Sequence, residues 1–260
     1  MSTAASTESR SALGKIVVVV EALAQTGRLS DIARQTRLPV STVHRILQEL
    51  VAAGWAREGE LRTYSLGARL LSLPARATGS ADLARLARPV LRDLAQQTGR
   101  TIHFAMLDGD QLVYLDKIEG RAAYAMKSRI GASSPLHCTA IGKAVLARFD
   151  DSEVRQVAAR TRLPAQTVRT LSDVSALLRH LRKVRAIRYA VDDEENELHT
   201  RCIGAAVVGH LGEPVGGVSV SSLAYDLSGS EVLEIGPMVV AAADRISKAL
   251  GDPGANASAE

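Results

Sequence analysis

The sequence predicts an α+β protein: a small winged helix-turn-helix followed by a larger domain with an antiparallel sheet flanked by helices. Three observations support this prediction. Residues 29–66 contain two short helical patterns, separated by a proline turn and followed by an alternating hairpin pattern. Later strand-like runs, such as 101–107 and 111–118, follow one another with no room for a crossover helix, which favours antiparallel pairing. The length of 260 residues fits two domains better than one.

The first helix of the pair is expected to run from its N-cap to about Thr36, followed by the turn Arg37-Leu38-Pro39. Ser30 is the expected N-cap, because its hydroxyl can accept a hydrogen bond from a first-turn amide. Pro39 cannot continue a helix and biases the residue before it away from helical angles. A further helix upstream, at about 11–25, is expected to close the small core with Ile16, Val17, Val20, Leu23 and Ala24.

The second helix begins near Val40 and has the pattern of a DNA recognition helix. Its apolar stripe is Val43, Ile46, Leu47 and Leu50. The opposite face is polar, and its residues at i, i+4 and i+7 share one exposed ridge. Short hydroxyls suit phosphates, and Arg or Gln can make bidentate contacts to base edges. The predicted DNA contacts of this helix are Ser41, Thr42, His44, Arg45 and Gln48.

The alternation from Trp55 to Leu66 around Gly59 is typical of a β-hairpin, which would form the wing. Trp55, Tyr64 and Leu66 are expected to anchor this hairpin in the core. Two arginines flank its tip and are expected to contact the DNA backbone or minor groove, namely Arg57 and Arg62. An isolated helix pair would more simply be a helical hairpin with a solvated face, but the added wing favours DNA binding.

Charge alone does not indicate DNA binding. The formal net charge is +4, and half of it lies in residues 1–66, where eight Lys and Arg stand against six Asp and Glu. No basic tail is present, so we expect a few side chains to recognise specific DNA bases, with two copies of the protein binding together as a dimer. Two cysteines, and the lack of an apolar run of about 20 residues or a signal peptide, predict a cytoplasmic protein without a membrane partner.

The domain boundaries follow from composition and breakers. A linker helix broken at Pro74 and Gly79 is expected between the two domains. The expected order is a disordered 1–10, a winged helix-turn-helix at 11–67, the linker helix at 68–81, a mixed α+β domain at 82–250 and a disordered tail at 251–260.

The second domain is predicted to open with a long amphipathic helix that Gly99 ends. Further helices are expected at 140–147, 151–159, 172–186 and 231–250, with Ser172 capping the third of them. Strands are expected at 101–107, 111–118, 122–130, 189–192, 202–208 and 215–222.

Ser219 and Ser221 stand at i and i+2 in a valine-rich strand, so both hydroxyls face one side of the sheet. This pattern indicates a polar ligand on that side. A hairpin turn near residues 210–211 would place Cys202 opposite Ser219, and Asp192 could reach the same face. The rest of the acidic run 192–195 is expected to be a solvated loop. Alternatively, the serines bond to backbone groups and Cys202 is inert core.

Four segments together resemble the IclR family of transcriptional regulators: PVSTVHRILQEL, PLHCTAIGKAVLA, YAVDDEENELHTRCIGAAV and GGVSVSSLAYDL. The resemblance covers about residues 10–250. It implies a GAF-like effector domain, a homodimer or homotetramer, an operator with palindromic half-sites, and a small-molecule effector, expected here to be a carboxylate or sugar acid. It also implies that the effector pocket is lined by Ala140, Ile141, Asp192, Cys202, Ser219 and Ser221.

Other chemistries fit the sequence less well. Gly142-Lys143 is no phosphate-binding P-loop, because Ala144 replaces the required hydroxyl. His199 and Cys202 have a metal-like spacing, but the other candidate ligands are scattered. We therefore expect a repressor with no cofactor, no metal and no catalytic residue. The alternative is a small-acid-processing enzyme with an appended winged helix, using Cys202 or Asp192 as a catalytic group.

Overall fold

The computed structural model describes residues 11–71, 80–121 and 128–252. The chain divides into two compact units, Met1–Thr78 and Gly79–Glu260, and each is described by itself. The predicted helix break at Pro74 and Gly79, the ends of the chain and residues 122–127 of a predicted strand lie outside the described residues. The finer domain boundaries given above stay predictions.

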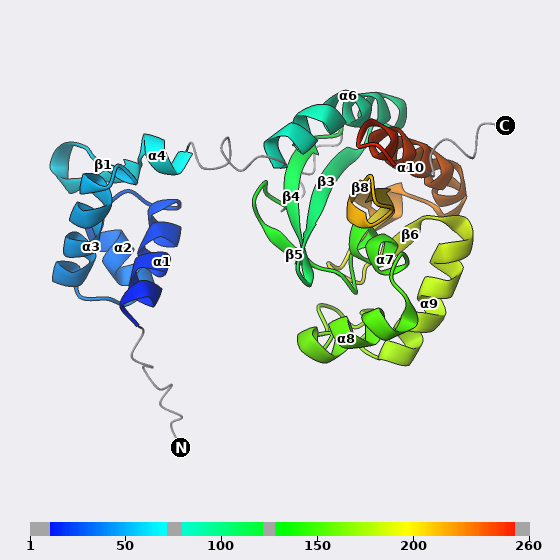
Figure 1. Ribbon diagram of the computed structural model, residues 1–260, viewed down its shortest axis with the longest axis horizontal. Coiled ribbons are helices and arrows are strands. Elements are labelled where there is room, and N and C mark those ends of the chain that lie inside the picture. Colours follow the sequence, from blue (N-terminus) through cyan, green and yellow to red (C-terminus); the bar gives the residue numbers. More distant parts are fainter. Residues whose placement is uncertain (1–10, 72–79, 122–127, 253–260) are drawn as a thin grey trace, which may run out of the picture. The chain divides into compact units, whose positions relative to one another are not determined.

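The first unit contains short helices and a two-stranded wing (Figure 1). The described elements are α1 (Ala12–Leu23), α2 (Leu29–Thr36), α3 (Val40–Ala52), β1 (Ala56–Glu58), the 3₁₀ turn η1 (Glu60–Arg62), β2 (Tyr64–Leu66) and α4 (Ala68–Leu71). Arg37 takes a left-handed conformation with φ 57° at the end of α2. The predicted helix, turn, helix and hairpin are thus confirmed.

The core of the first unit differs from the prediction in three details. Val43, Ile46, Leu47 and Leu50 are buried as expected. On α1, however, Val19 and Ala22 are buried while Val17 and Ala24 are exposed, so the buried face is turned from the predicted one. Trp55 is 37% exposed, whereas Tyr64 is buried as predicted. The N-cap of α2 is Arg28 rather than Ser30, and its side chain makes no capping bond.

The second unit is a six-stranded sheet with helices on both faces. Its helices are α6 (Ser80–Thr98), α7 (Ala140–Leu146), α8 (Asp151–Thr161), α9 (Val174–Ile187) and α10 (Gly229–Ala249), with a 3₁₀ turn η2 (Ala224–Asp226). Its strands are β3 (Thr101–Asp108), β4 (Gln111–Ile118), β5 (Ser133–Pro135), β6 (Ala190–Asp193), β7 (Thr200–Val208) and β8 (Pro214–Leu223). The strand order is β5-β4-β3-β8-β7-β6, and every pair is antiparallel, as predicted.

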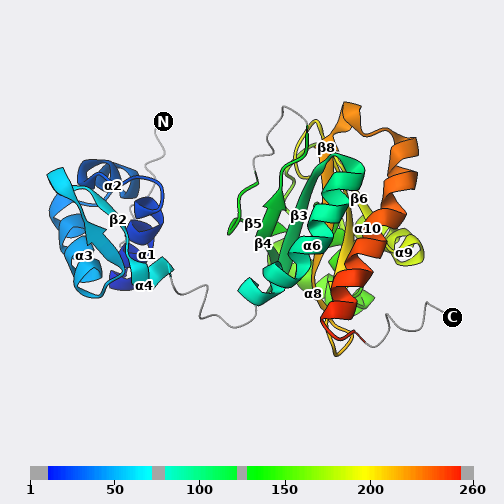
Figure 2. The same ribbon diagram turned by 90° about the horizontal axis from the view of Figure 1, so that it is seen from above.

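The two faces of this sheet carry different side chains, because neighbouring residues of a strand point to opposite sides. Helices α6 and α10 cover one face (Figure 2), where the apolar core includes Ile203 and Val220. Helix α7 packs against the other face, with α9 beside α7 and α8 beside α9, and the core there includes Ala105 and Ile141. On β3, β7 and β8, the side chains that point towards this second face include polar ones.

Two glycines allow α7 to lie directly on the sheet. A Cβ at Gly204 would meet the backbone carbon of Ala140 and the amide nitrogen of Ile141 at 2.6 Å. A Cβ at Gly217 would meet the Cγ2 atom of Ile141 at 2.7 Å. Any larger residue would therefore push the first turn of α7 away from β7 and β8.

Several local predictions for the second unit are wrong. Residues 128–130 are not a strand, and the edge strand β5 lies later in the chain. Asp173, not Ser172, caps α9 by accepting a bond from the amide of Ala176. Cys202 pairs with Ser221 rather than Ser219, because β8 begins at Pro214 and a register shift lies at the end of β7. Gly99 ends α6 with φ 66°, as predicted.

In the described ranges, no helix is both long and apolar enough to cross a membrane.

Candidate functional sites

The predicted DNA-contact residues of α3 all lie off its buried stripe. Ser41 and Arg45 are exposed, and Thr42, His44 and Gln48 are half-buried. Arg45 forms an ion pair with Glu49, with 2.8 Å between Nη1 and Oε1, and both side chains are largely exposed. An exposed i, i+4 pair of this kind contributes only about 0.3–0.5 kcal/mol, so the guanidinium can leave Glu49 for a base or phosphate at small cost.

A polar cluster joins α3 to the wing. Gln48 donates from Nε2 to Glu58 at 2.9 Å and to the hydroxyl of Tyr64 at 3.3 Å. The hydroxyl of Tyr64 donates in turn to Glu58 at 3.0 Å. Arg57 is exposed on β1, while the side chain of Arg62 lies outside the described part of the structure. The wing is thus oriented by the same helix that carries the predicted base-reading residues.

A cavity of about 370 Å³ lies between the sheet and the first turn of α7 in the second unit. All six residues predicted to line an effector pocket line this one cavity: Ala140, Ile141, Asp192, Cys202, Ser219 and Ser221. The structure therefore brings together residues from four separate segments of the chain. Their role in binding stays a prediction.

The alternation of the strands explains this convergence. Ile203, Val218 and Val220 face α6 and α10, so their neighbours Cys202, Ser219 and Ser221 face α7. Asp192 lies beside Cys202 because β6 pairs with β7 in that register. Gly204 and Gly217 then bring Ala140 and Ile141 close above the strands.

The sequence does not predict several polar residues that also line the cavity. They come from β3, β4, β7 and the loops, and include His103, Tyr114, Thr139, Gln166, Asn196, Glu197 and Thr200. The alternation of residues 101–107 would have placed His103 on one face of its strand. It could not show that β3 pairs with β8, which brings His103 opposite Ser219.

His103 is a neutral, fully bonded member of the cavity wall. Its Nδ1 lies 3.1 Å from the hydroxyl of Ser221, and its Nε2 lies 2.6 Å from that of Ser128. Burial, and then the charge of Lys117, lowers the pKa of His103 to about 3. A neutral imidazole donates through one nitrogen and accepts through the other, so it fixes how the two hydroxyls point.

Asp192 is the most strongly perturbed carboxyl group of the cavity. Burial raises its pKa to about 7, against the opposing effects of Lys143 and of two backbone amides. Those amides belong to Glu195 and Asn196, which donate to Oδ1 at 2.8 and 3.2 Å. Among the described residues that line the cavity, the charged side chains are two carboxylates, Asp192 and Glu197, with no Lys or Arg.

The acidic run 192–195 is not the solvated loop that the sequence suggests. Glu195 is only 7% exposed, and its carboxylate pairs with the completely buried ammonium of Lys143. The pattern gave no sign of this pair, because its partners stand 52 positions apart in the chain.

The two cysteines do not have the properties of nucleophiles. Burial raises the pKa of Cys138 to about 12, and burial together with Asp192 raises the pKa of Cys202 as well. A reactive cysteine needs a thiolate at neutral pH, so both side chains are protonated thiols. Within the described ranges, no group of three or more His, Cys, Asp or Glu is placed to hold a metal ion.

Two other hollows contain none of the six predicted residues. One, of about 450 Å³, adjoins the cavity at Ser133, Ser134, Pro135 and Gln166. The other, of about 260 Å³, lies between α7, α9 and α10 beside three arginines, Arg148, Arg185 and Arg188.

Both units match known protein families. Residues 75–248 match the bacterial transcriptional regulator IclR C-terminal domain, and residues 12–60 match the IclR helix-turn-helix domain. The chain belongs to the IclR family. It is therefore a DNA-binding transcriptional regulator, and the partners of such regulators are DNA and a small-molecule effector.

Similar proteins agree with this assignment. The chain is 36% identical to the HTH-type transcriptional regulator KdgR of Escherichia coli over 94% of both proteins. It is 31% identical to the transcriptional repressor IclR of E. coli, over 86% of this chain and 82% of that protein. These relatives are regulators and repressors, so the alternative that this IclR-family chain is an enzyme is not supported.

A solved structure shows the same fold. It is an IclR homologue from Microbacterium hydrocarbonoxydans complexed with 4-hydroxybenzoate, with a TM-score of 0.79 and 24% identity. The similarity covers 92% of this chain and 99% of that one.

Proposed function

We propose that this IclR-family regulator is a repressor whose affinity for its operator changes when a small organic acid enters the cavity beneath α7. The observation that carries this proposal is the burial of many hydroxyl, amide and carboxyl groups around one cavity of about 370 Å³. Polar groups are costly to bury unless they are bonded, and a cavity rich in them suits a polar ligand.

The lining favours a hydroxylated monocarboxylate, such as a sugar acid. Ser219, Ser221 and Thr200 offer hydroxyls that both donate and accept, while ionised Asp192 and Glu197 accept from ligand hydroxyls. Because the pKa of Asp192 is about 7, its protonated form can also donate to a carboxylate near neutral pH. The Microbacterium relative, which is complexed with 4-hydroxybenzoate, supports a carboxylate in this fold.

The DNA side of the proposal uses the exposed face of α3 and the wing. Ser41, Thr42 and His44 are proposed to contact phosphates or base edges, Arg45 and Gln48 to read bases, and Arg57 with Arg62 to contact the flanking backbone or minor groove. One unit carries a formal charge of only +2 over residues 1–66. We therefore propose that two or four copies act together on palindromic half-sites, in the cytoplasm, where the DNA lies.

In this mechanism the effector acts by shifting a population. A ligand that binds one arrangement of the paired regulators more tightly shifts the equilibrium towards it, and so changes the spacing of two recognition helices. The same ligand must then bind free regulator and operator-bound regulator with different affinity.

Two measurements test the proposal together. Electrophoretic shift with the DNA upstream of the protein's own gene is expected to show sequence-specific binding that competitor DNA does not remove. A thermal-shift experiment then measures the melting temperature of the protein with D-gluconate, D-galacturonate, pyruvate, glyoxylate and 4-hydroxybenzoate. A hydroxylated acid is expected to raise it most. The absence of any specific DNA complex would contradict the proposed operator binding. A melting temperature that none of the five acids raises would contradict the proposed effector class.

A further inference from the structure

Lys143 is a completely buried cation that lies next to the cavity without lining it. Its ammonium donates to the carbonyl oxygen of Val191 at 2.6 Å and pairs with the carboxylate of Glu195. Val191 immediately precedes Asp192, and Glu195 immediately precedes Asn196 and Glu197, which line the cavity. One side chain of α7 thus holds both ends of the segment that brings these three polar residues to the cavity.

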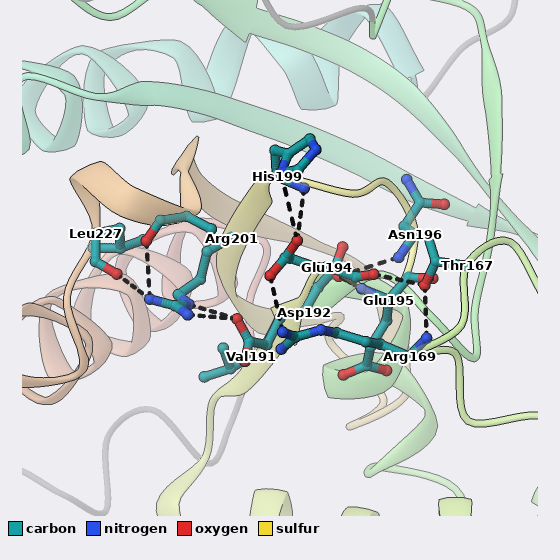
Figure 3. Close-up of polar contacts among 12 residues, drawn as sticks. Thr167, Arg169, Val191, Asp192, Glu194, Glu195, Asn196, His199, Arg201 and Leu227 are labelled. Carbon is teal, nitrogen blue, oxygen red and sulfur yellow. Dashed lines mark hydrogen bonds and ion pairs between the residues drawn. The ribbon is translucent and has the colours of Figure 1, made fainter.

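The segment from Asp192 to His199 is tightly turned, and its outer side has anchors of its own (Figure 3). Glu194 and His199 both have positive φ, at 62° and 65°. Thr167 donates to the carbonyl of Glu194 at 2.7 Å. Arg169 and Arg201 pair with the carboxylate of Asp193, Arg201 at 2.7 Å. These contacts hold the loop against its surroundings but do not face the cavity.

Stability alone does not explain the Lys143–Glu195 pair. Removing two charges from water costs several kcal/mol per ion, and apolar residues of similar volume are often as good or better for the fold. The pair is also incompletely bonded, because the second oxygen of Glu195 is buried with no hydrogen-bond partner among the described residues. What the pair does provide is a fixed position for the loop, because an ammonium bonded to two acceptors allows little displacement of either acceptor.

We infer that Lys143 is a positioning residue for the effector cavity: by binding the Val191 carbonyl and the Glu195 carboxylate, it fixes the loop so that Asp192, Asn196 and Glu197 face the ligand. The inference rests on the proposed function, since it assigns Lys143 a part in binding at that same cavity. It gives α7 a second role, beyond placing Ala140 and Ile141 above the strands.

The same pair acts on the charge of Asp192. Lys143 favours the ionised form of Asp192, and Glu195 opposes it more weakly, so the two partners move the pKa of Asp192 in opposite directions. The titratable groups whose charges interact with that of Asp192 come from α7, the loop, β4, β7 and the turn before α7, and include Lys143, Glu195, Tyr114, Cys202 and Cys138. Glu197 lines the same cavity as Asp192.

The test compares Lys143→Met with Arg185→Met in the full-length protein. Arg185 is a matched control because it anchors the other end of the same helix, donating to the carbonyls of Ala147 and Phe149 at 3.1 and 2.9 Å. In Lys143→Met the amides of Glu195 and Asn196, which bind Asp192, are expected to exchange with solvent at least tenfold faster. Arg185→Met is expected to leave them unchanged.

A carbon-13 titration of the Asp192 carboxyl supplies a readout that a general loss of stability would not produce. The pKa of Asp192 is expected to rise in Lys143→Met and to fall in Glu195→Gln, because the first removes a cation and the second an anion. If Lys143→Met does not fold, the neutral pair Lys143→Met with Glu195→Gln replaces it. There the pKa is still expected to rise, because Lys143 has the larger effect of the two.

D-gluconate is the ligand probe for the final measurement. Lys143→Met is expected to weaken its binding at least tenfold while operator affinity stays within twofold of the unmodified protein. Unchanged amide exchange together with an unchanged Asp192 pKa would overturn the positioning role, whatever the ligand result. If D-gluconate does not bind the unmodified protein while exchange and pKa shift as expected, the choice of ligand fails and the role of Lys143 stands.

Discussion

The polar face of α3 and the polar cavity beneath α7 contain similar side chains in opposite settings. On α3 the proposed contact residues lie within eight consecutive positions of one helix, and Ser41 and Arg45 are exposed. In the cavity, Asp192, Ser219 and Ser221 are buried and come from two different strands. The exposed face depends on one helix alone, whereas the buried one depends on the pairing of the whole sheet.

This difference predicts how each site responds to substitution. An exposed side chain on α3 can be removed with little effect on folding, so its loss should appear in DNA binding alone. A buried cavity residue shares its hydrogen bonds with its neighbours, as His103 does with Ser221 and Ser128. Its loss should therefore change both ligand affinity and the bonding of the wall.

The largest expected effect comes from Ser219→Ala combined with Ser221→Ala. Each lost hydroxyl leaves a ligand group unbonded, so effector affinity is expected to fall roughly 100-fold for the pair. Operator affinity without effector is expected to stay within twofold, as measured by electrophoretic shift beside calorimetric titration of the effector. Ser222→Ala is the matched control, because Ser222 lies on the same strand and accepts from Arg100 at 2.7 Å. Retained effector response in the double variant would remove both serines from the site.

A smaller effect, on DNA discrimination, is expected from Arg45→Ala on the exposed face of α3. Loss of a bidentate base contact costs about 1–3 kcal/mol of discrimination, while the lost ion pair with Glu49 contributes little to folding. The ratio of operator to non-operator affinity should fall with no change in melting temperature. Arg34→Ala is the control, since Arg34 is an equally exposed, ion-paired arginine on α2. Equal loss in both variants would mean that only net charge matters.

The smallest expected effect is on the pH dependence of folding. Because folding raises the pKa of Asp192 to about 7, the unfolded chain holds fewer protons at this group than the folded one between about pH 4 and 7. The contribution of Asp192 to the free energy of unfolding is therefore present at low pH and is lost as the pH rises through 7. Between pH 5 and pH 8, the melting temperature of the second unit should fall by roughly 2–4 °C less in Asp192→Asn than in the unmodified protein.

Calorimetry of Asp192→Asn against Asp108→Asn checks this sign. Asp108 lies exposed at the end of β3 and away from the cavity, so its replacement should leave the pH dependence unchanged. A pH dependence that is the same in Asp192→Asn and in the unmodified protein would show that Asp192 does not titrate in this range.

The errors of prediction have different physical causes. Helix pairs, the hairpins and the antiparallel class could be predicted because they depend on patterns within about twenty residues. Ser30 and Ser172 were one or two residues from the actual caps, a normal imprecision for helix ends. Cys202 was placed against the wrong serine because a shift near Val208 changes the register of the hairpin. The burial of Glu195 was missed because it depends on a partner in a distant helix.

Motifs and residue alternation were enough to predict the family, the DNA-contact face of α3 and the six residues that line one cavity, because both are properties of the chain alone. What surrounds those residues depends on how distant segments pack together. The pairing of β3 with β8 added His103 to the wall, and the packing of α7 on Gly204 placed Lys143 beside Glu195. Both depend on contacts between segments far apart in the chain, which set burial and charge and which a local pattern does not specify.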